Sequence, residues 1–455
     1  MSDDIGPCSG DGLKIGEDST NVDCKGHSIT GTQGYLSSGV NLSRYDGTTL
    51  RNCKIYSFWF GVYLDSSYNS LIGNTATNNF FGYFSGQRYF SNGSASSSSL
   101  SGNYFTSNKA TFALGAGFEF LNGNGFVLSK NTADSNGIGF FLAGDYFTVT
   151  RNTASNGGEE GFFIIGSHNT FNGNLARLNV LNGYELWHAS TNSLKNNLAS
   201  NNAGNGFLLA NADDNSLIKN SATSNGHSGL NLTNSMGNFL TKNTAKSNGV
   251  NGIAVLNSSS NAIVGNSATK NVFSGITLYT SHSNYLKGNT ASKNLRSGIT
   301  LAYSSTNNTL VKNSALGNSN HGFYFLYSAS NIALTNVAKA NGIDGFNMWF
   351  SNASSLGGNS AMKNVRQGFF FHFSSQSQVF GNTAKSNLDN GFWVEGLSIG
   401  NTFSANSADG DSTYGYLDTT SGAGSLGTAN FYSIDECHGN LVAGSSPTGA
   451  CTPQP

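Results

Sequence analysis

Charge is scarce in this sequence. Charged residues make up 10% of the chain, and 23 Lys and Arg stand against 24 Asp and Glu, so the formal net charge is −1. A near-neutral surface of hydroxyl and amide groups offers no electrostatic attraction to nucleic acid or to an anionic membrane. We therefore expect neither as a partner.

Long hydrophobic runs are also missing. No apolar run approaches the roughly 18 residues that a membrane span needs, and no charged segment precedes an apolar one as in a signal peptide. The helical pattern is absent as well, because no run of about ten residues places apolar side chains at i, i+3, i+4 and i+7. The sequence predicts neither a membrane span nor a helical domain.

Cysteines are few, and none are spaced to bind metal. The chain has 5 cysteines, and no Cys-x-x-Cys pair occurs. We therefore expect no metal and no other cofactor.

A repeat dominates the remaining sequence. The segment Asn220–Gly229 (NSATSNGHSG) returns as NTAKSNGVNG, NSATKNVFSG and NTASKNLRSG at intervals of 23 residues. A period of this length is typical of a solenoid, because one unit cannot bury its own apolar face. The anchor asparagines that begin the repeats are Asn74, Asn103, Asn131, Asn152, Asn174, Asn197, Asn220, Asn243, Asn266, Asn289, Asn313, Asn336, Asn359, Asn382 and Asn406.

Each repeat contains three short runs of apolar or small residues. In the Asn197 repeat these are residues 197–199, 206–210 and 216–218. Runs of three to five residues between Asn and Gly predict short strands joined by tight turns. The sequence therefore predicts an all-β solenoid, a parallel β-helix with three strands in each coil of about 23 residues.

Two columns of apolar residues support this fold. One follows the repeated Gly, and the other lies two residues further on, as two inward positions of one strand must. The first column is Phe162, Tyr184, Phe207, Leu230, Ile253, Ile276, Ile299, Phe323, Phe346, Phe369, Phe392 and Tyr416, and the second runs from Ile164 to Val394. The anchor Asn column suits turns, because Asn tolerates positive φ and stacked carboxamides can hydrogen-bond from coil to coil.

Three regions follow from the repeat. Residues 1–20 are polar and irregular and are expected to form an N-terminal cap. Residues 21–418 are expected to form about seventeen coils, interrupted by a Ser-rich loop insertion near residues 91–101. Residues 419–455 are Gly- and Ser-rich and are expected to form a C-terminal cap, because an uncapped solenoid would expose a sheet edge.

Residues Asp23–Gly31 (DCKGHSITG), the following residues 52–55 (NCKI) and the later Asn-Thr-Ala repeats resemble a known family. They are similar to right-handed parallel β-helix repeat proteins, the NosD-type and pectin-lyase-like surface or secreted proteins, over about residues 8–420. The resemblance implies a right-handed parallel β-helix. It implies no single activity, because the family includes lyases, hydrolases, epimerases, phage tailspikes and adhesins.

The cysteines and sequons add covalent candidates. All five cysteines lie near the ends, so Cys437–Cys451 is expected to form one disulfide and two of Cys8, Cys24 and Cys53 another. Alternatively, Cys24 and Cys53 are small buried hydrophobic residues in successive coils. Candidate glycosylation sites are Asn41, Asn92, Asn231, Asn257, Asn307 and Asn352.

Catalytic motifs are sparse. Enzymes of this fold need clustered carboxylates with a basic partner, yet the polygalacturonase-like and epimerase-like motifs are absent apart from the pair Asp213-Asp214. A basic groove for acidic polysaccharides is also incomplete, because Lys and Arg precede the anchor Asn in only some repeats. The best remaining group is Arg366, His372, Asp389 and Glu395. Equal distances from the anchors place Arg366 above Asp389 and His372 above Glu395, as an acid/base site or as surface ion pairs.

Outward aromatic residues recur at fixed distances from the anchors. They are Trp187, Tyr279, Tyr303, Tyr327, Trp349, Phe350, Phe370 and Trp393. Such a column of exposed rings can bind sugars, pack against another copy of the chain, or lie under loops. The sequence therefore favours a non-catalytic extracellular rod, structural or adhesive, that binds itself or an extracellular polysaccharide. The alternative is a polysaccharide lyase, hydrolase or epimerase.

Overall fold

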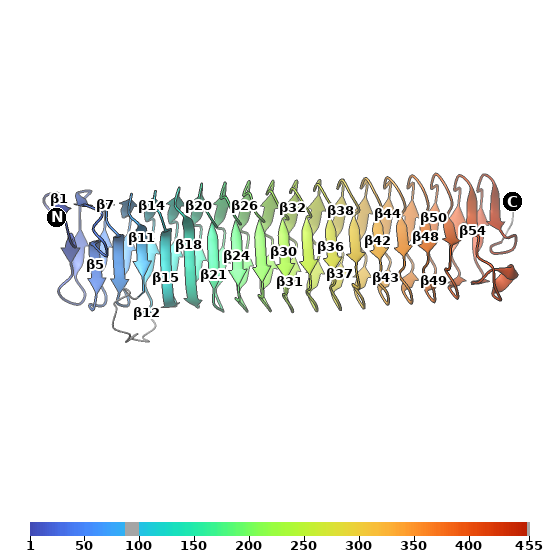
Figure 1. Ribbon diagram of the computed structural model, residues 1–455, viewed down its shortest axis with the longest axis horizontal. Helices are drawn as coiled ribbons and strands as arrows, with labels where there is room; N and C mark the ends of the chain where they lie inside the picture. The colour runs from blue at the N-terminus through green and yellow to red at the C-terminus, as the bar shows by residue number, and fades with distance from the viewer. Residues whose placement is uncertain (87–99, 453–455) are drawn as a thin grey trace. The chain divides into compact units, whose positions relative to one another are not determined.

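The computed structural model describes residues 1–86 and 100–452. The chain divides into two compact units, Met1–Gly226 (unit 1) and His227–Pro455 (unit 2), each built of stacked parallel β-coils (Figure 1). The only helical element in the described residues is a 3₁₀ turn, Ser425–Gly427. Residues 91–99 of the predicted Ser-rich loop, with Asn92, lie outside the described residues.

The predicted fold class is confirmed. The chain makes about 17 parallel coils of about 23 residues, with three short strands per coil that build three sheets. Each coil is a three-sided turn because Gly and Asn interrupt the alternating pattern every few residues and force the chain to change direction. The pairs Ile276↔Ile299 and Leu278↔Leu301 illustrate the constant register between coils.

The sheet with the longest strands is called the broad sheet here, because most of its strands place two side chains in the core. In unit 1 it contains β2 (Leu13–Lys14), β5 (Ser38–Ser43), β8 (Phe60–Asp65), β11 (Phe81–Ser85), β12 (Leu100–Ser101), β15 (Ala116–Asn124), β18 (Ile138–Asp145), β21 (Phe162–Ile165), β24 (Tyr184–Trp187) and β27 (Phe207–Ala210). In unit 2 it contains β30 (Leu230–Thr233), β33 (Ile253–Leu256), β36 (Ile276–Tyr279), β39 (Ile299–Ala302), β42 (Phe323–Leu326), β45 (Phe346–Trp349), β48 (Phe369–His372), β51 (Phe392–Glu395), β54 (Tyr414–Asp418) and β57 (Ala443–Ser446).

The other two sheets consist mainly of three-residue strands with one inward side chain each. The alanine sheet has Ala at most inward positions and runs from β1 (Ile5–Cys8) and β4 (Ser28–Gly31) to β29 (Ser221–Thr223) in unit 1, and from β32 (Thr244–Lys246) to β56 (Glu436–His438) in unit 2. The leucine sheet, with Leu, Phe, Val or Ile at most inward positions, runs from β3 (Asn21–Asp23) to β28 (Ser216–Ile218), and from β31 (Phe239–Thr241) to β55 (Phe431–Ser433). The small alanines let the alanine sheet approach the broad sheet.

The core contains the two predicted columns together with the inward side chains of the alanine and leucine sheets. In unit 2, Phe323, Phe346, Phe369 and Phe392 are fully buried, and their rings stack at centroid distances of 4.6, 4.9 and 4.7 Å. The spacing follows from the distance between strands, which is about 4.8 Å in any β-sheet. One ring per coil therefore stacks on the next at the spacing of the strands.

Three ladders of asparagines, not one, stabilise the turns of unit 2. The Asn266 side chain shows the pattern: its Nδ2 donates to Oδ1 of Asn289 (3.0 Å) and to the carbonyl of Leu240 (2.8 Å), while its backbone N–H donates to the same Oδ1 (2.8 Å). Each buried amide is thereby satisfied by the next coil. The first ladder includes Asn238, Asn261, Asn284, Asn308 and Asn331, the second Asn243 to Asn406, and the third Asn248, Asn271, Asn294, Asn318, Asn341, Asn364 and Asn387.

Two details of the predicted Asn column are wrong. The anchor Asn does not adopt positive φ; the residue before it does, as at Gly265 (φ +65) and Lys312 (φ +55). Asn103 does not belong to the anchor column, because Asn74 donates to Asn108, which in turn donates to Asn131. The extra residues before residue 100 lengthen this repeat, so counting from Asn74 led to Asn103 of the first ladder instead of Asn108 of the second.

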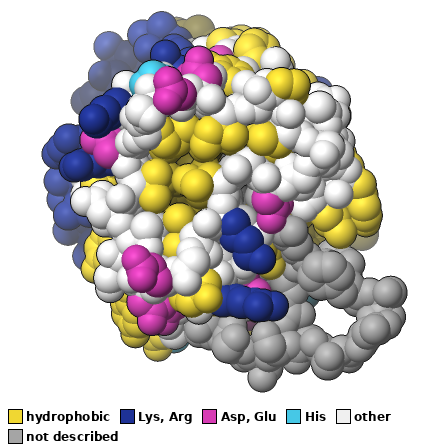
Figure 2. Space-filling view, turned by 90° about the vertical axis from the view of Figure 1, so that its left-hand side faces the viewer, with side chains coloured by type: hydrophobic (Ala, Val, Ile, Leu, Met, Phe, Trp, Pro, Cys, Tyr) yellow, Lys and Arg dark blue, Asp and Glu magenta, His cyan; other side chains and the backbone are white. Residues whose placement is uncertain are grey.

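The two ends contain strands as well. The first twenty residues contain β1 and β2, which pair with the later strands β4 and β5. After residue 418, strands β55, β56 and β57 add a further coil. At the N-terminal end of unit 1, hydrophobic, acidic and basic side chains are mixed on the surface (Figure 2).

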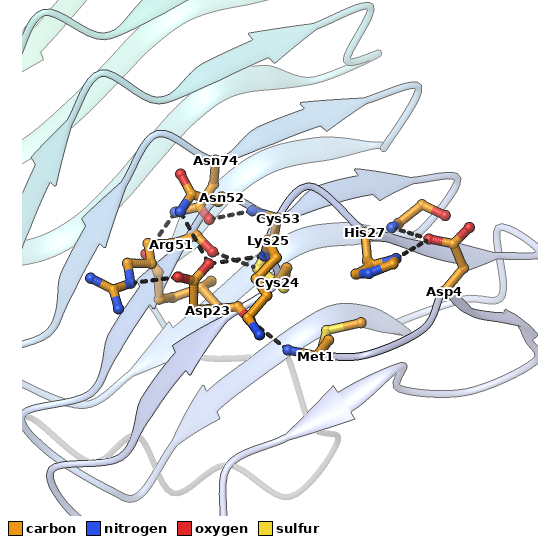
Figure 3. The surroundings of a disulfide bond; sticks show 12 residues. Met1, Asp4, Asp23, Cys24, Lys25, His27, Arg51, Asn52, Cys53 and Asn74 are labelled. Atoms are coloured by element: carbon orange, nitrogen blue, oxygen red, sulfur yellow. Dashed lines mark hydrogen bonds and ion pairs between the residues drawn. A yellow bond between two sulfur atoms is a disulfide. The ribbon is translucent and has the colours of Figure 1, made fainter.

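A disulfide lies at each end of the chain. Cys24 and Cys53 are bonded and take the places that Asn occupies in later coils of the second ladder, since the backbone N–H of Cys53 donates to Asn74. Asp23 beside this disulfide bonds Arg51 and Asn52 (Figure 3). Cys437 and Cys451 form the predicted second disulfide, and Cys8 is free. Two disulfides indicate a compartment outside the reducing cytoplasm.

Candidate functional site

A ladder of aromatic rings lines one edge of the broad sheet in unit 2. Tyr279, Tyr303, Tyr327, Phe350 and Phe373 contact one another in successive coils, with centroid distances of 5.1, 6.0, 4.9 and 4.7 Å. Tyr303 and Tyr327 are 48% and 47% exposed. The predicted outward column therefore exists in unit 2, and Phe373 extends it.

The backbone makes these rings unexpected. Tyr303, Tyr327, Phe350 and Phe373 all have φ of +48 to +49, a left-handed conformation that Asn adopts more readily than bulky side chains. Asn257 occupies the same turn position two coils before Tyr303, with φ +48. Since Asn would suit the backbone better at every one of these positions, packing of the turn does not account for the rings. Their exposed positions point to a role at the surface.

The ring ladder adjoins the outer surface of β39, β42, β45, β48 and β51. The ladder and this outer surface are together called the aromatic face. Its middle row contains Trp349, whose ring lies 4.4 Å from that of His372. His372 in turn contacts Glu395, with 2.9 Å between Nδ1 and Oε1. This contact matches the predicted stacking of His372 on Glu395. Both side chains are partly exposed, so an imidazole paired with a carboxylate faces solvent beside the rings.

A polar row forms the other edge of the aromatic face. Asp344, 2% exposed, has its Oδ2 3.1 Å from His321 Nδ1 and accepts a hydrogen bond from Asn347 Nδ2 (2.7 Å). The backbone N–H of Gln367 donates to Oδ1 of the same carboxylate. Three buried atoms of this row, Asn347 Oδ1, Gln367 Nε2 and Trp393 Nε1, have no hydrogen-bond partner among the described residues. Because these three atoms are buried, they are unsatisfied polar groups beneath the surface of the face and not contacts that a ligand can reach.

Some predicted aromatic residues occupy other environments. Phe370 is only 7% exposed, because Trp393 packs on its ring at 4.9 Å and His372 lies beside it. It supports the face from below and is not an exposed contact residue, contrary to the prediction. Trp187 is 42% exposed but belongs to unit 1, where its ring contact is with His188.

The second predicted ion pair is not formed. Arg366 and Asp389 hold equivalent places in successive coils, but no ion pair joins them in the described part of the chain. Asp389 instead accepts hydrogen bonds from Thr413 Oγ1 and Asn390 Nδ2, both at 3.1 Å. Arg366 stands exposed at the rim of the aromatic face. Of the four catalytic candidates, only His372 and Glu395 are brought together.

Unit 1 contains carboxyl groups that sequence reasoning missed. Glu160 and Glu185 are 7% and 8% exposed, lie on the outer side of the broad sheet and are close enough to interact; Asn182 Nδ2 donates to Glu185 (2.8 Å). Burial, with a smaller contribution from Glu185, raises the pKa of Glu160 to about 7. Burial also raises the pKa of Glu119 to about 7. The alternation in β24 (YELW) was the signal that Glu185 points outward.

Neither a metal site nor a membrane helix can be assigned. In residues 1–86 and 100–452, no group of three or more His, Cys, Asp or Glu side chains is arranged to hold a metal ion. Over the same residues, no helix has the length and apolar character needed to cross a membrane.

The candidate glycosylation sites differ in exposure. Asn41 is 5% exposed and donates through Nδ2 to Asp11 (2.7 Å), so the folded chain does not present it as an acceptor. Asn257, Asn307 and Asn352 are exposed, and Asn231 is half-buried.

Family comparisons agree with the fold. A family described as the right handed beta helix region matches residues 38–199 and 190–338, more than half of the chain. A second family, described as periplasmic copper-binding protein (NosD), matches residues 268–423. Because the described residues hold no cluster of metal ligands, no copper site is assigned to this chain. No curated protein sequence matches it.

Solved structures resemble the chain in fold alone. The A-module of a mannuronan C-5 epimerase from Azotobacter vinelandii is 15% identical with a TM-score of 0.35, over 77% of this chain and 84% of that one. DFA-IIIase from Arthrobacter chlorophenolicus is 12% identical with a TM-score of 0.37, over 78% and 83%. The Dettilon tailspike protein is 16% identical with a TM-score of 0.41, over 69% and 61%. Similarity this low says nothing about activity.

Proposed function

Because the chain belongs to the right-handed β-helix family, whose fold serves many chemistries, we propose that its function lies in the aromatic face. This face binds a polysaccharide without cleaving it. The chain then acts as an adhesive or structural protein outside the cytoplasm, a location with which its two disulfides agree.

The observation that supports this most is the ring ladder from Tyr279 to Phe373. Its rings repeat once per coil and are exposed or half-buried, and all except Tyr279, the last residue of β36, stand at turn positions where large side chains are unfavourable. A polymer of sugars can contact several rings at once, and repeated weak contacts on one chain add up to useful affinity. A small ligand would have no need of five successive rings.

Affinity electrophoresis through gels that contain polysaccharides tests the proposal. The double variant Tyr303→Ser with Tyr327→Ser removes the two most exposed rings of the ladder, and we expect it to lose retardation by the polysaccharide that slows the wild type. The matched control is Phe239→Ser with Tyr285→Ser, which removes two exposed rings from the leucine sheet of the same unit. Equal loss in both double variants, or no retardation of the wild type by any polysaccharide, would contradict the proposal.

Cleavage or epimerisation of a polysaccharide is the second candidate function, favoured by one contact. The His372–Glu395 pair is partly exposed, joined at 2.9 Å and adjacent to Trp349 and Phe373. An imidazole held by a carboxylate can accept and return a proton. Release of reducing or unsaturated ends by the wild type, abolished in His372→Ala, would favour this candidate over simple binding. We expect no such release.

A further inference from the structure

The charge distribution around the aromatic face bears on what kind of polysaccharide fits it. None of the ten broad-sheet strands of unit 2 contains Lys or Arg. The lysines of this unit lie on the other two sheets and the turns beside them, at Lys242, Lys246, Lys270, Lys287, Lys293, Lys312, Lys339, Lys363 and Lys385. The polar row and the ring ladder are therefore free of lysines.

Among the described residues, two arginines stand at the rim of the face, in addition to His321 and His372, which contact its carboxylates. Arg296 has its guanidinium 4.7 Å from the ring of Phe273, and Arg366 is exposed one residue before Gln367. Three carboxyl groups, those of Asp344, Asp389 and Glu395, lie on or beside the same surface. A polyanion laid along this face would meet more negative than positive charge and would gain no electrostatic attraction.

The stacking of the rings determines what they offer a ligand. Tyr327, Phe350 and Phe373 lie nearly parallel to their neighbours, with interplanar angles of 14° and 6°. Among these three, each ring covers the face of the next, so the exposed portions are ring edges and the Tyr327 hydroxyl group. Tyr303 lies at 24° to Tyr327, and Tyr279 is tilted by 46° to Tyr303. Ring edges and tyrosine hydroxyl groups are contacts for uncharged hydroxyl groups and C–H surfaces.

We propose that the aromatic face takes an uncharged polysaccharide, contacted through ring edges and hydroxyl groups, and that it discriminates against acidic polysaccharides. This inference rests on the proposed function and narrows its ligand class. The hydroxyl groups of Tyr303 and Tyr327 then contribute directly to binding, which face-on stacking of sugar on the rings would not require.

Matched pairs of polymers test the ligand class. The probes are hydroxyethyl and carboxymethyl cellulose, starch and carboxymethyl starch, and dextran and dextran sulfate, each in affinity gels at about 50 and about 500 mM NaCl, where screening differs several-fold. We expect the neutral member of a binding pair to retard the chain several-fold more, with no effect of salt. Tighter, salt-sensitive binding of the acidic member would overturn the inference while leaving polysaccharide binding intact.

A charge-gain variant provides an internal control. Leu326→Lys places a cation in the middle row of the aromatic face, and Thr233→Lys places one in the same column four coils earlier, away from the ladder. Leu326→Lys, and not Thr233→Lys, should add salt-sensitive binding of the acidic polymers. Equal behaviour of the two variants would show that the acidic polymers do not reach this face and would count against the site.

Two further outcomes separate this inference from the function on which it rests. Loss of neutral-polymer binding in Tyr303→Phe with Tyr327→Phe supports hydroxyl contacts, whereas full retention overturns that part of the inference. If no polymer binds and mass photometry finds dimers that Tyr303→Ser with Tyr327→Ser dissociates, the occupant is a second copy of the chain. The inference and the proposed function then both fail.

Discussion

Replacing Asp411 by Asn should stabilise unit 2 increasingly as the pH rises from about 4 to about 7, and most at neutral and alkaline pH. Asp411 occupies the third Asn ladder: its Oδ1 accepts from the backbone N–H (2.8 Å) and Nδ2 (2.9 Å) of Asn387, and its own N–H donates to Asn440 Oδ1 (2.9 Å). Its Oδ2 takes the place of an Asn Nδ2 and has no hydrogen-bond partner among the described residues. An Asn there would restore the donor that every neighbouring ladder member provides.

The size of the effect follows from the pKa. Burial, opposed by the hydrogen bonds from Asn387, raises the pKa of Asp411 from 3.8 to about 7. Because the folded-state pKa is the raised one, the carboxyl group favours folding below pH 3.8, and this contribution is lost as the pH rises to about 7. Three pKa units at about 1.36 kcal/mol each give about 4 kcal/mol as the most that Asp411→Asn can recover at pH 8.

Urea unfolding followed by circular dichroism at pH 4 and at pH 8 measures this. We expect nearly equal midpoints for wild type and Asp411→Asn at pH 4, and a clearly higher midpoint for the variant at pH 8. Asp409→Asn is the control, because Asp409 lies two residues earlier, is exposed and bonds Lys385 (2.6 Å), so its loss should stabilise nothing. A variant that is no more stable than wild type at pH 8 would refute the argument that burial raises the pKa of this carboxyl group.

The remaining predictions concern other parts of the chain. Asn289→Ala should destabilise unit 2 by on the order of 3 kcal/mol in urea unfolding, because buried groups that bond this side chain lose their partners; an unchanged midpoint would mean that water replaces the amide. Glu160→Gln should remove the loss of stability that wild type shows between pH 4.5 and about 7, since burial raises the folded-state pKa of this group; an unaltered pH profile of the thermal midpoint would assign that loss elsewhere. Removing the Cys24–Cys53 bridge, which spans 29 residues, with serines at both positions should cost about 3 to 4 kcal/mol, and a variant as stable as wild type under oxidising conditions would contradict it.

Constant coil length made part of the site predictable. Because the coils keep one register, His372 and Glu395 at equal distances from their anchors had to meet, and their Nδ1–Oε1 contact is 2.9 Å. The same reasoning wrongly predicted an ion pair between Arg366 and Asp389, because side chains in the loop before the broad sheet have several possible partners within reach. Asp389 accepts hydrogen bonds from Thr413 and Asn390 instead, and the spacing of the repeat does not predict these partners.

Sequence by itself determined the architecture, because a 23-residue repeat with apolar side chains two residues apart can bury its core only by stacking coils. It determined too that rings recur along one surface. Only the tertiary structure decided how those rings are oriented. They stack so that their edges face solvent, and Phe370 is buried by its neighbours. Several atoms of the polar row have no hydrogen-bond partner among the described residues. It also brought Glu160 to Glu185, from adjoining coils. Such outcomes depend on side-chain packing between neighbouring coils, which the pattern within one coil does not contain.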